Sequence, residues 1–159
     1  QTFSLFLGYP TLSLSVLLTA LLASSGIGSF VSNRMKLITV LKAPLLVSGV
    51  VAAYALALPA VLDMLFLLPL LYRVLVAIVL VFPLGFSLGM PFPAGVRRLK
   101  MGAEERIPWM WGVNSVFSLL GSVLAVAMAM TLGFSFALLV GAATYVMVFL
   151  VGYEALKSQ

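Results

Sequence analysis

Long apolar runs separated by short polar turns dominate the pattern of this chain. Five of these runs are about 20 residues long, the length at which a helix crosses roughly 30 Å of hydrocarbon. They do not follow the alternating ten-residue pattern that membrane β-strands require. The pattern therefore predicts an all-α bundle of about five membrane-spanning helices, at residues 10–31, 37–58, 70–90, 109–131 and 135–156.

Prolines indicate where these helices begin, bend or stop. Pro10 is predicted to open the first span, because proline is well tolerated in a first helical turn. Residues 59–69 are too few to cross a bilayer and include Asp63, so they are predicted to form a loop with a brief interfacial helix. Pro83, followed by Gly89, is predicted to kink or unwind the second half of the third span, because proline removes a backbone hydrogen bond.

Small residues recur at helical spacing in the first span. One row consists of Ser15, Thr19, Ala23 and Gly26, and a shorter one of Ser25 and Ser29. Such rows let two membrane helices approach closely, so we expect the first span to pack tightly against another helix.

Composition places the chain in a membrane. Hydrophobic residues make up 64% of the sequence and charged residues only 8%, with a mean hydropathy of +1.25. An ordinary soluble domain is about a quarter charged, so too few polar residues are present here to cover a soluble surface. We interpret the 159 residues as a single transmembrane domain, part of a longer chain or of a larger assembly.

Histidine and cysteine are both absent from the sequence. Their absence excludes disulfides, metal sites built on these ligands, His-based catalytic triads and His ligation of haem. No charged residue falls in the middle of a predicted span, which argues against a proton relay, a voltage sensor or an ion-coupled pump. We therefore predict no catalytic residue, no metal and no cofactor.

Basic residues fall almost entirely on one side of the predicted topology. Eight of the nine share that side and Arg73 alone lies opposite. The positive-inside rule makes the basic side cytoplasmic, and we expect the chain in a bacterial cytoplasmic membrane. The net charge of +5 is interpreted as topology and attraction to anionic lipid, not as nucleic-acid binding. The eight residues are Arg34, Lys36, Lys42, Arg97, Arg98, Lys100, Arg106 and Lys157.

Polar chemistry concentrates between the third and fourth spans. The run Met90-Pro91-Phe92-Pro93 is predicted to stop the helix, because its prolines remove amide donors. The loop behind it either docks a soluble domain or an anionic ligand, or serves only as a basic anchor at the lipid headgroups. Its cations are Arg97, Arg98, Lys100 and Arg106. Glu104 and Glu105 are expected to form local ion pairs.

The fourth span is predicted to begin with interfacial tryptophans and a seam of small residues. Trp109 and Trp111 are expected at the membrane surface, where amphipathic indoles gather. Asn114 lies about one turn deeper, where its amide needs a partner on another helix, on backbone opened near Pro83, or in a hydrated pocket. Helix packing is favoured for this face over a substrate path. The same face continues with Ser118, Gly121, Ser122, Ala125 and Ala129.

Four short motifs are distinctive. Two are Gly89-Met90-Pro91-Phe92-Pro93-Ala94-Gly95-Val96-Arg97 and Trp109-Met110-Trp111-Gly112-Val113-Asn114, the second followed by Ser118 and Gly121-Ser122. The others are Phe3-Ser4-Leu5-Phe6-Leu7-Gly8-Tyr9-Pro10 and Ser25-Gly26-Ile27-Gly28-Ser29. Together they resemble the membrane portion of the multi-spanning spermidine-synthase-like proteins, with Tyr9 where that family has a histidine.

In that family a Rossmann-type, aminopropyltransferase-like soluble domain accompanies the membrane helices. This sequence has no Gly-rich loop after a strand and no acidic diamine pocket. The resemblance therefore implies a membrane domain, and it does not imply aminopropyl transfer by these residues.

The sequence leads to one preferred function and two alternatives. The preferred one is a non-catalytic domain or subunit that anchors or supports a larger membrane assembly. Its expected partners are membrane lipids and, at the cytoplasmic face, other protein subunits or a soluble domain. The first alternative is transport of a small organic solute, a polyamine or a lipid, past Pro83 and Asn114. The second is an accessory subunit of an energy-transducing membrane complex.

Overall fold

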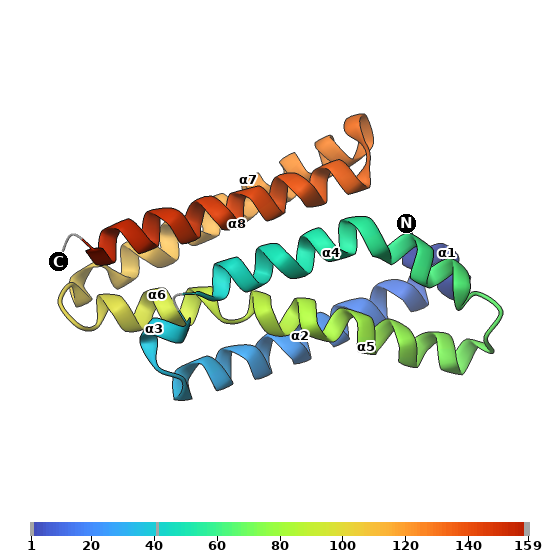
Figure 1. The fold of residues 1–159 in the computed structure, drawn as a ribbon, viewed down its shortest axis with the longest axis horizontal. Helices are drawn as coiled ribbons and strands as arrows, with labels where there is room; N and C mark the ends of the chain where they lie inside the picture. Colours follow the sequence, from blue (N-terminus) through green and yellow to red (C-terminus); the bar gives the residue numbers. More distant parts are fainter. Residues whose placement is uncertain (1, 41, 158–159) are drawn as a thin grey trace.

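The computed structural model describes residues 2–40 and 42–157, and these residues form helices without any β-strand. The predicted all-α class is confirmed. In chain order the elements are α1 (Thr2–Leu7), α2 (Pro10–Arg34), α3 (Leu37–Val40), α4 (Ala43–Met64), α5 (Leu70–Leu88), α6 (Pro91–Leu99), the 3-10 helix η1 (Glu104–Arg106), α7 (Ile107–Leu132) and α8 (Phe134–Lys157) (Figure 1).

Four stretches of the described chain are long and apolar enough to cross a membrane. They are Pro10–Arg34, Leu70–Leu99, Glu104–Leu132 and Phe134–Glu154. Helix α4, the predicted second span, has 22 residues, and its stretch Ala43–Leu58 is apolar. It runs beside α5 from the α3 end of the bundle to the opposite end, as Figure 1 shows.

The boundaries predicted for this second span are wrong. Residues 37–58 do not form one helix, because α3 ends at Val40 and α4 begins at Ala43. Pro44 fits in the first turn of α4, since amides there have no helical acceptor. Helix α4 then continues past Pro59 to Met64, so the loop predicted at 59–69 shrinks to residues 65–69.

The prolines around α5 and α6 also act differently from the prediction. Helix α5 remains helical across Pro83 to Leu88, so its second half is not unwound. The break comes at Gly89 and Met90, and the chain then returns to a helix instead of forming a loop. Pro91 and Pro93 both lie in the first turn of α6, where missing amide donors cost little.

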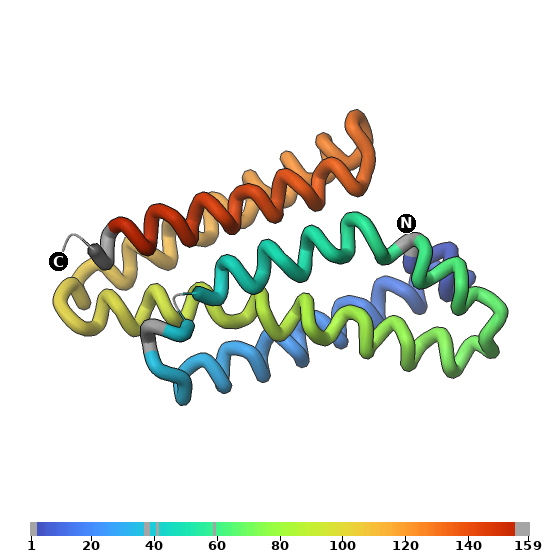
Figure 2. Tube along the Cα trace, in the orientation of Figure 1, coloured from blue at the N-terminus to red at the C-terminus, as the bar shows by residue number. Residues whose placement is uncertain are grey.

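Helices α2, α4 and α5 form a central bundle, and α1 packs against one end of it (Figure 2). Helix α8 packs along α4, and α7 lies against α8 as the outer arm of a hairpin. Buried apolar residues join these layers in three clusters, at α1 with α4 and α5, at α3 with α6, and at α4 with α8. Their buried members are Phe6, Leu7, Leu62 and Ala77; Val40, Ala43, Met90 and Ala94; and Val47, Val51 and Ala142.

The closest helix packing occurs between α2 and α5. On α2 the buried face includes the four-residue row Ala20, Ser24, Gly28 and Ser32, and on α5 it includes Ala77, Val81 and Gly85. A methyl group at Gly28 would overlap the backbone carbonyl of Phe86, and one at Gly89 would overlap the carbonyl of Ser25. Tight packing of the first span through small residues is thus confirmed, but the predicted row from Ser15 to Gly26 is exposed.

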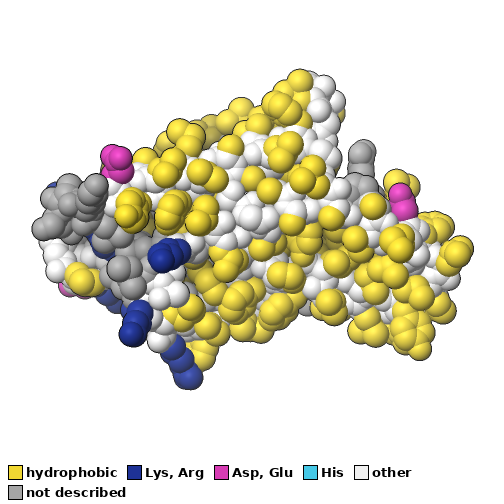
Figure 3. Space-filling model, viewed as in Figure 1, with side chains coloured by type: hydrophobic (Ala, Val, Ile, Leu, Met, Phe, Trp, Pro, Cys, Tyr) yellow, Lys and Arg dark blue, Asp and Glu magenta, His cyan; other side chains and the backbone are white. Residues whose placement is uncertain are grey.

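Charged side chains gather at one end of the molecule. Figure 3 shows Lys and Arg clustered around the end where α3 and α6 lie, with hydrophobic side chains covering the length of the visible face. At the opposite end the connection between α4 and α5 is flanked by Asp63 and Arg73. The predicted separation of basic residues is therefore present in the described residues; the side chain of Lys157 lies outside them.

Candidate functional site

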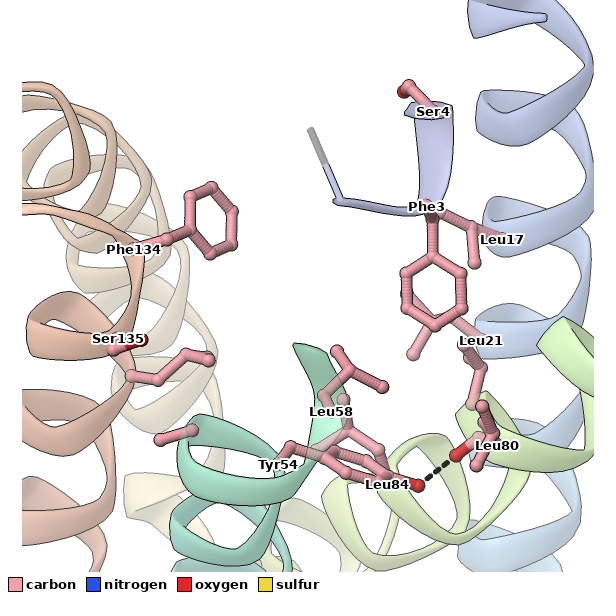
Figure 4. Close-up of a pocket in the computed structure, with 13 residues that line it drawn as sticks. Phe3, Ser4, Leu17, Leu21, Tyr54, Leu58, Leu80, Leu84, Phe134 and Ser135 are labelled. Atoms are coloured by element: carbon pink, nitrogen blue, oxygen red, sulfur yellow. Dashed lines mark hydrogen bonds between the residues drawn. The ribbon is translucent and has the colours of Figure 1, made fainter. Parts of the chain in front are cut away.

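A cavity of about 260 Å³ opens between the N-terminal end of α8 and the pair α1–α2. Figure 4 shows Phe134 and Ser135 on one side of it, Phe3 and Leu17 on the other, and side chains of α4 and α5 across the floor. The lining residues come from five helices and are Phe3, Ser4, Leu17, Leu21, Tyr54, Ala55, Leu58, Leu80, Val81, Leu84, Phe134, Ser135 and Leu138.

The floor of the cavity contains a hydrogen bond between two helices. The Tyr54 hydroxyl on α4 donates to the backbone carbonyl of Leu80 on α5 (Figure 4). Pro83 lies one turn further along α5, has no amide hydrogen, and its ring crowds the preceding turn. The missing amide of Pro83 would have bonded the carbonyl of Val79, so Tyr54 bonds the adjacent carbonyl, in the turn that the proline ring crowds.

The chemistry of the cavity is almost wholly apolar. Its lining includes no charged side chain, and only Ser4, Tyr54 and Ser135 carry polar side-chain groups. Within the described residues no group of three acidic residues is placed to hold a metal ion, and no buried side-chain nitrogen or oxygen lacks a hydrogen-bond partner. This arrangement suits binding of a hydrocarbon.

The cations predicted for the loop between the third and fourth spans have different roles in the structure. Arg97 points back into the bundle, where its guanidinium donates to the backbone carbonyls of Ser32 at 2.7 Å and Met35 at 3.0 Å. It thereby caps the C-terminal end of α2, adding to the hydrogen bond that the Met35 amide donates to Ser32. Arg98 is partly buried on α6, whereas Lys100 and Arg106 are exposed.

Arg98 and Arg106 together border a shallow depression of about 390 Å³ that the turn at residues 101–103 completes. Arg106 lies 3.8 Å from Glu105, as the expected local ion pairing requires. Both side chains of this pair are about three-quarters exposed, so it contributes little to stability.

The two tryptophans predicted as interfacial anchors lie in the first turns of α7, at the basic end. Trp109 is 76% exposed. Trp111 packs edge-on against Phe92 with ring centroids 4.6 Å apart, so it also joins α7 to α6.

Most of the seam predicted on the fourth span is uncovered in the described chain. Asn114, Ser118 and Ser122 are exposed, and nothing lies within 4 Å of a methyl group built on Gly121. No residue of α7 is buried. Packing of this seam against another helix of the described chain, as predicted for Gly121, is therefore wrong. Pro83 and Gly89, assigned to the same group, lie instead in α5 and at its C-terminal end; Pro83 is exposed, and Gly89 lies against the Ser25 carbonyl of α2.

Sequence reasoning missed Tyr54 and the internal role of Arg97. Small residues at four-residue spacing run from Ala20 to Ser32, and this row indicates the packed face of α2. The less regular row from Ser15 to Gly26 was chosen in its place. Tyr54 carried a weaker signal, as a phenol near the middle of an apolar helix that must find an acceptor.

No family model matches the sequence, and no curated protein or solved structure shows a significant similarity to it.

Proposed function

We propose that this chain is a non-catalytic membrane domain that anchors or supports a larger assembly, and that α7 is its contact helix. The observation that carries the proposal is the outward position of Asn114, for which the described residues provide no hydrogen bond. Asn114 lies about 5–8 Å deeper along α7 than the two tryptophans, at 1.5 Å per residue. Lipid tails cannot bond an amide at that depth, whereas a partner helix can.

Two further features of α7 support contact with a partner. The hydroxyls of Ser115 and Ser122 donate to carbonyls of α7 itself, those of Trp111 at 2.9 Å and Leu119 at 2.8 Å. These serines therefore present no unsatisfied hydroxyl to a neighbouring helix. Gly121 removes side-chain bulk at the centre of the same stretch. Close approach of a second helix through small residues is the usual mode of association in membranes.

The resemblance to the membrane portion of spermidine-synthase-like proteins is part of this proposal. Two of the stretches that carry it adjoin at the basic end, where Phe92 of α6 contacts Trp111 of α7. We propose that this end faces the cytoplasm and receives a soluble domain or subunit at the exposed cations Lys100 and Arg106.

Measurement of assembly size in native lipid particles tests the role of α7. We expect the wild type to form a particle larger than the 16.9 kDa chain, and Gly121→Leu or Asn114→Leu to reduce the particle size without changing thermal stability. Leu120→Ala, an exposed change next to the seam, is the matched control. A wild type that is monomeric in its native lipid would refute the proposal.

Transport of a small apolar solute is the second candidate, because the cavity lies against the proline-containing helix α5. Its uncharged lining favours a lipid over a polyamine, since a polyamine needs acidic partners. Proteoliposome uptake separates the two functions: saturable uptake of a labelled solute that Ala55→Phe, a change at the cavity floor, abolishes would replace the anchoring function by transport.

A further inference from the structure

The cavity beside α8 has two walls from different helices and a floor in which a hydrogen bond joins α4 to α5. One wall is the start of α8, which follows the turn at Gly133, and the other consists of α1 and the middle of α2. The floor is held by the Tyr54 to Leu80 hydrogen bond between α4 and α5. Figure 4 shows the space between Phe134 and Phe3 leading down to Leu58 and Leu84.

The cavity provides nothing that holds water. A buried water molecule needs about two to four polar partners, and apolar cavities of about 150 Å³ stay dry and take up hydrocarbons such as benzene. The Tyr54 hydroxyl is already bonded, and the remaining polar side chains, Ser4 and Ser135, lie at the outer part of the cavity (Figure 4). At about 260 Å³ the space has room for a ligand larger than benzene.

The position of the cavity relative to the bilayer determines which ligands can reach it. Helices α2, α5 and α8, which supply most of the walls, belong to the membrane-spanning stretches, and Tyr54 lies near the middle of α4. The mouth lies between Phe3 and Phe134, which is 55% exposed and begins the span of α8. The floor lies further along the spans, at the depth where hydrocarbon chains are the abundant apolar species.

We propose that this cavity is a binding site for one flexible hydrocarbon chain, either an acyl chain of a bilayer phospholipid or the tail of a free single-chain amphiphile. Leucine side chains from α2, α4, α5 and α8 provide the contact surface. The site is independent of the outward face of α7, none of whose residues line it.

Photolabelling tests the proposal with protein in bilayers that contain a phospholipid bearing a diazirine near the end of one acyl chain. A second arm uses a free fatty acid with the same group. We expect labelling of the peptides that contain Leu17, Leu21 or Leu138 to saturate, and excess unlabelled lipid of the same kind to compete for it. Labelling in the phospholipid arm identifies a bilayer lipid as the source, and labelling in the fatty-acid arm alone identifies a free amphiphile.

Ala55→Phe fills the cavity from its floor, because Ala55 lines it and is buried. We expect at least a tenfold loss of saturable labelling. Ala57→Phe adds the same ring to the exposed side of the same helix and should leave labelling unchanged. If Ala55→Phe fails to fold, Ser135→Phe, an exposed change at the mouth, replaces it. Labelling that does not saturate, or that persists in the filled variant, would overturn the proposal and leave the assembly measurement untouched.

Discussion

Two arginines of this membrane chain bond to backbone carbonyls at helix C-terminal ends. Arg73 donates to Phe6 at the end of α1 and to Leu68 just before its own helix, both at 2.8 Å. Arg97 does the same for Ser32 and Met35 at the end of α2. The carbonyl end of a helix carries partial negative charge, so it accepts a guanidinium without any acidic residue.

Replacement of Arg97 by Gln is expected to lower the free energy of unfolding by about 1–3 kcal/mol, because hydrogen bonds that involve a charged group contribute about this amount. Thermal unfolding in detergent measures the change. Lys100→Gln removes the same charge from the exposed end of α6 and is the control. Equal losses in the two variants would mean that Arg97 acts through net charge and not through its bonds to α2.

Tyr54→Phe removes the hydroxyl that bonds to the carbonyl of Leu80 and should cost about 0.6 kcal/mol, the average for hydrogen bonds between membrane helices, and at most about 1.7 kcal/mol. A double-mutant cycle with Pro83→Ala measures how far the proline creates the need for this bond. We expect the loss to be smaller in the Pro83→Ala background, because without the proline ring the turn that contains the Leu80 carbonyl can close, and Leu84 can donate to that carbonyl in place of Tyr54. A loss of stability of the same size in both backgrounds would mean that the Tyr54 hydrogen bond does not depend on Pro83.

At the scale of elements, α2 and α5 show how far a sequence predicts packing. The spans themselves follow from apolar length, and small residues at helical spacing correctly indicated that the first span packs closely. Small residues occur on more than one face of α2, however, and only the position of α5 determines that Gly28 is buried and Gly26 exposed. The prediction of a loop after residues 90–93 was wrong for a related reason. A proline that ends one helix is equally well tolerated in the first turn of the next, as in α6.

These two glycines of α2 provide a matched test of the α2–α5 contact. Gly28→Ala should destabilise the protein by about 1–3 kcal/mol, because the added methyl group meets backbone that cannot move aside. Gly26→Ala places the same group in open space on the same helix and should be neutral or slightly stabilising. Detergent unfolding curves compare the two, and equal stability would place α5 elsewhere.

Helix α7 marks the limit of prediction from sequence for the candidate site. Its seam from Asn114 to Ala125 has the spacing of a packed face, and the described chain leaves that face uncovered. A single sequence contains the pattern of an interface but not the identity of the chain on the other side. The cavity could not be predicted from the sequence either, because its lining comes from five helices that are distant in sequence.

At the scale of the whole molecule, the uneven distribution of charge between the two ends predicts a fixed orientation. The chain has no cysteine, so single cysteines report accessibility cleanly. In intact bacterial cells an impermeant thiol reagent should label Leu67→Cys, which lies in the loop after α4, and should not reach Gly102→Cys, between α6 and η1. Labelling of Gly102→Cys from outside would reverse the proposed topology.

The distance in sequence between Arg97 and the carbonyls that it caps affects how the chain is made. Arg97 follows Ser32 by 65 residues, so at about 5–20 residues per second α2 is synthesised several seconds before its cap exists. During that interval its serines need no other helix, because Ser24 donates to Ala20 at 2.6 Å and Ser32 to Ser29 at 2.7 Å. Helix α2 can therefore enter the bilayer without an unsatisfied hydroxyl at either position, before Arg97 is available to cap it.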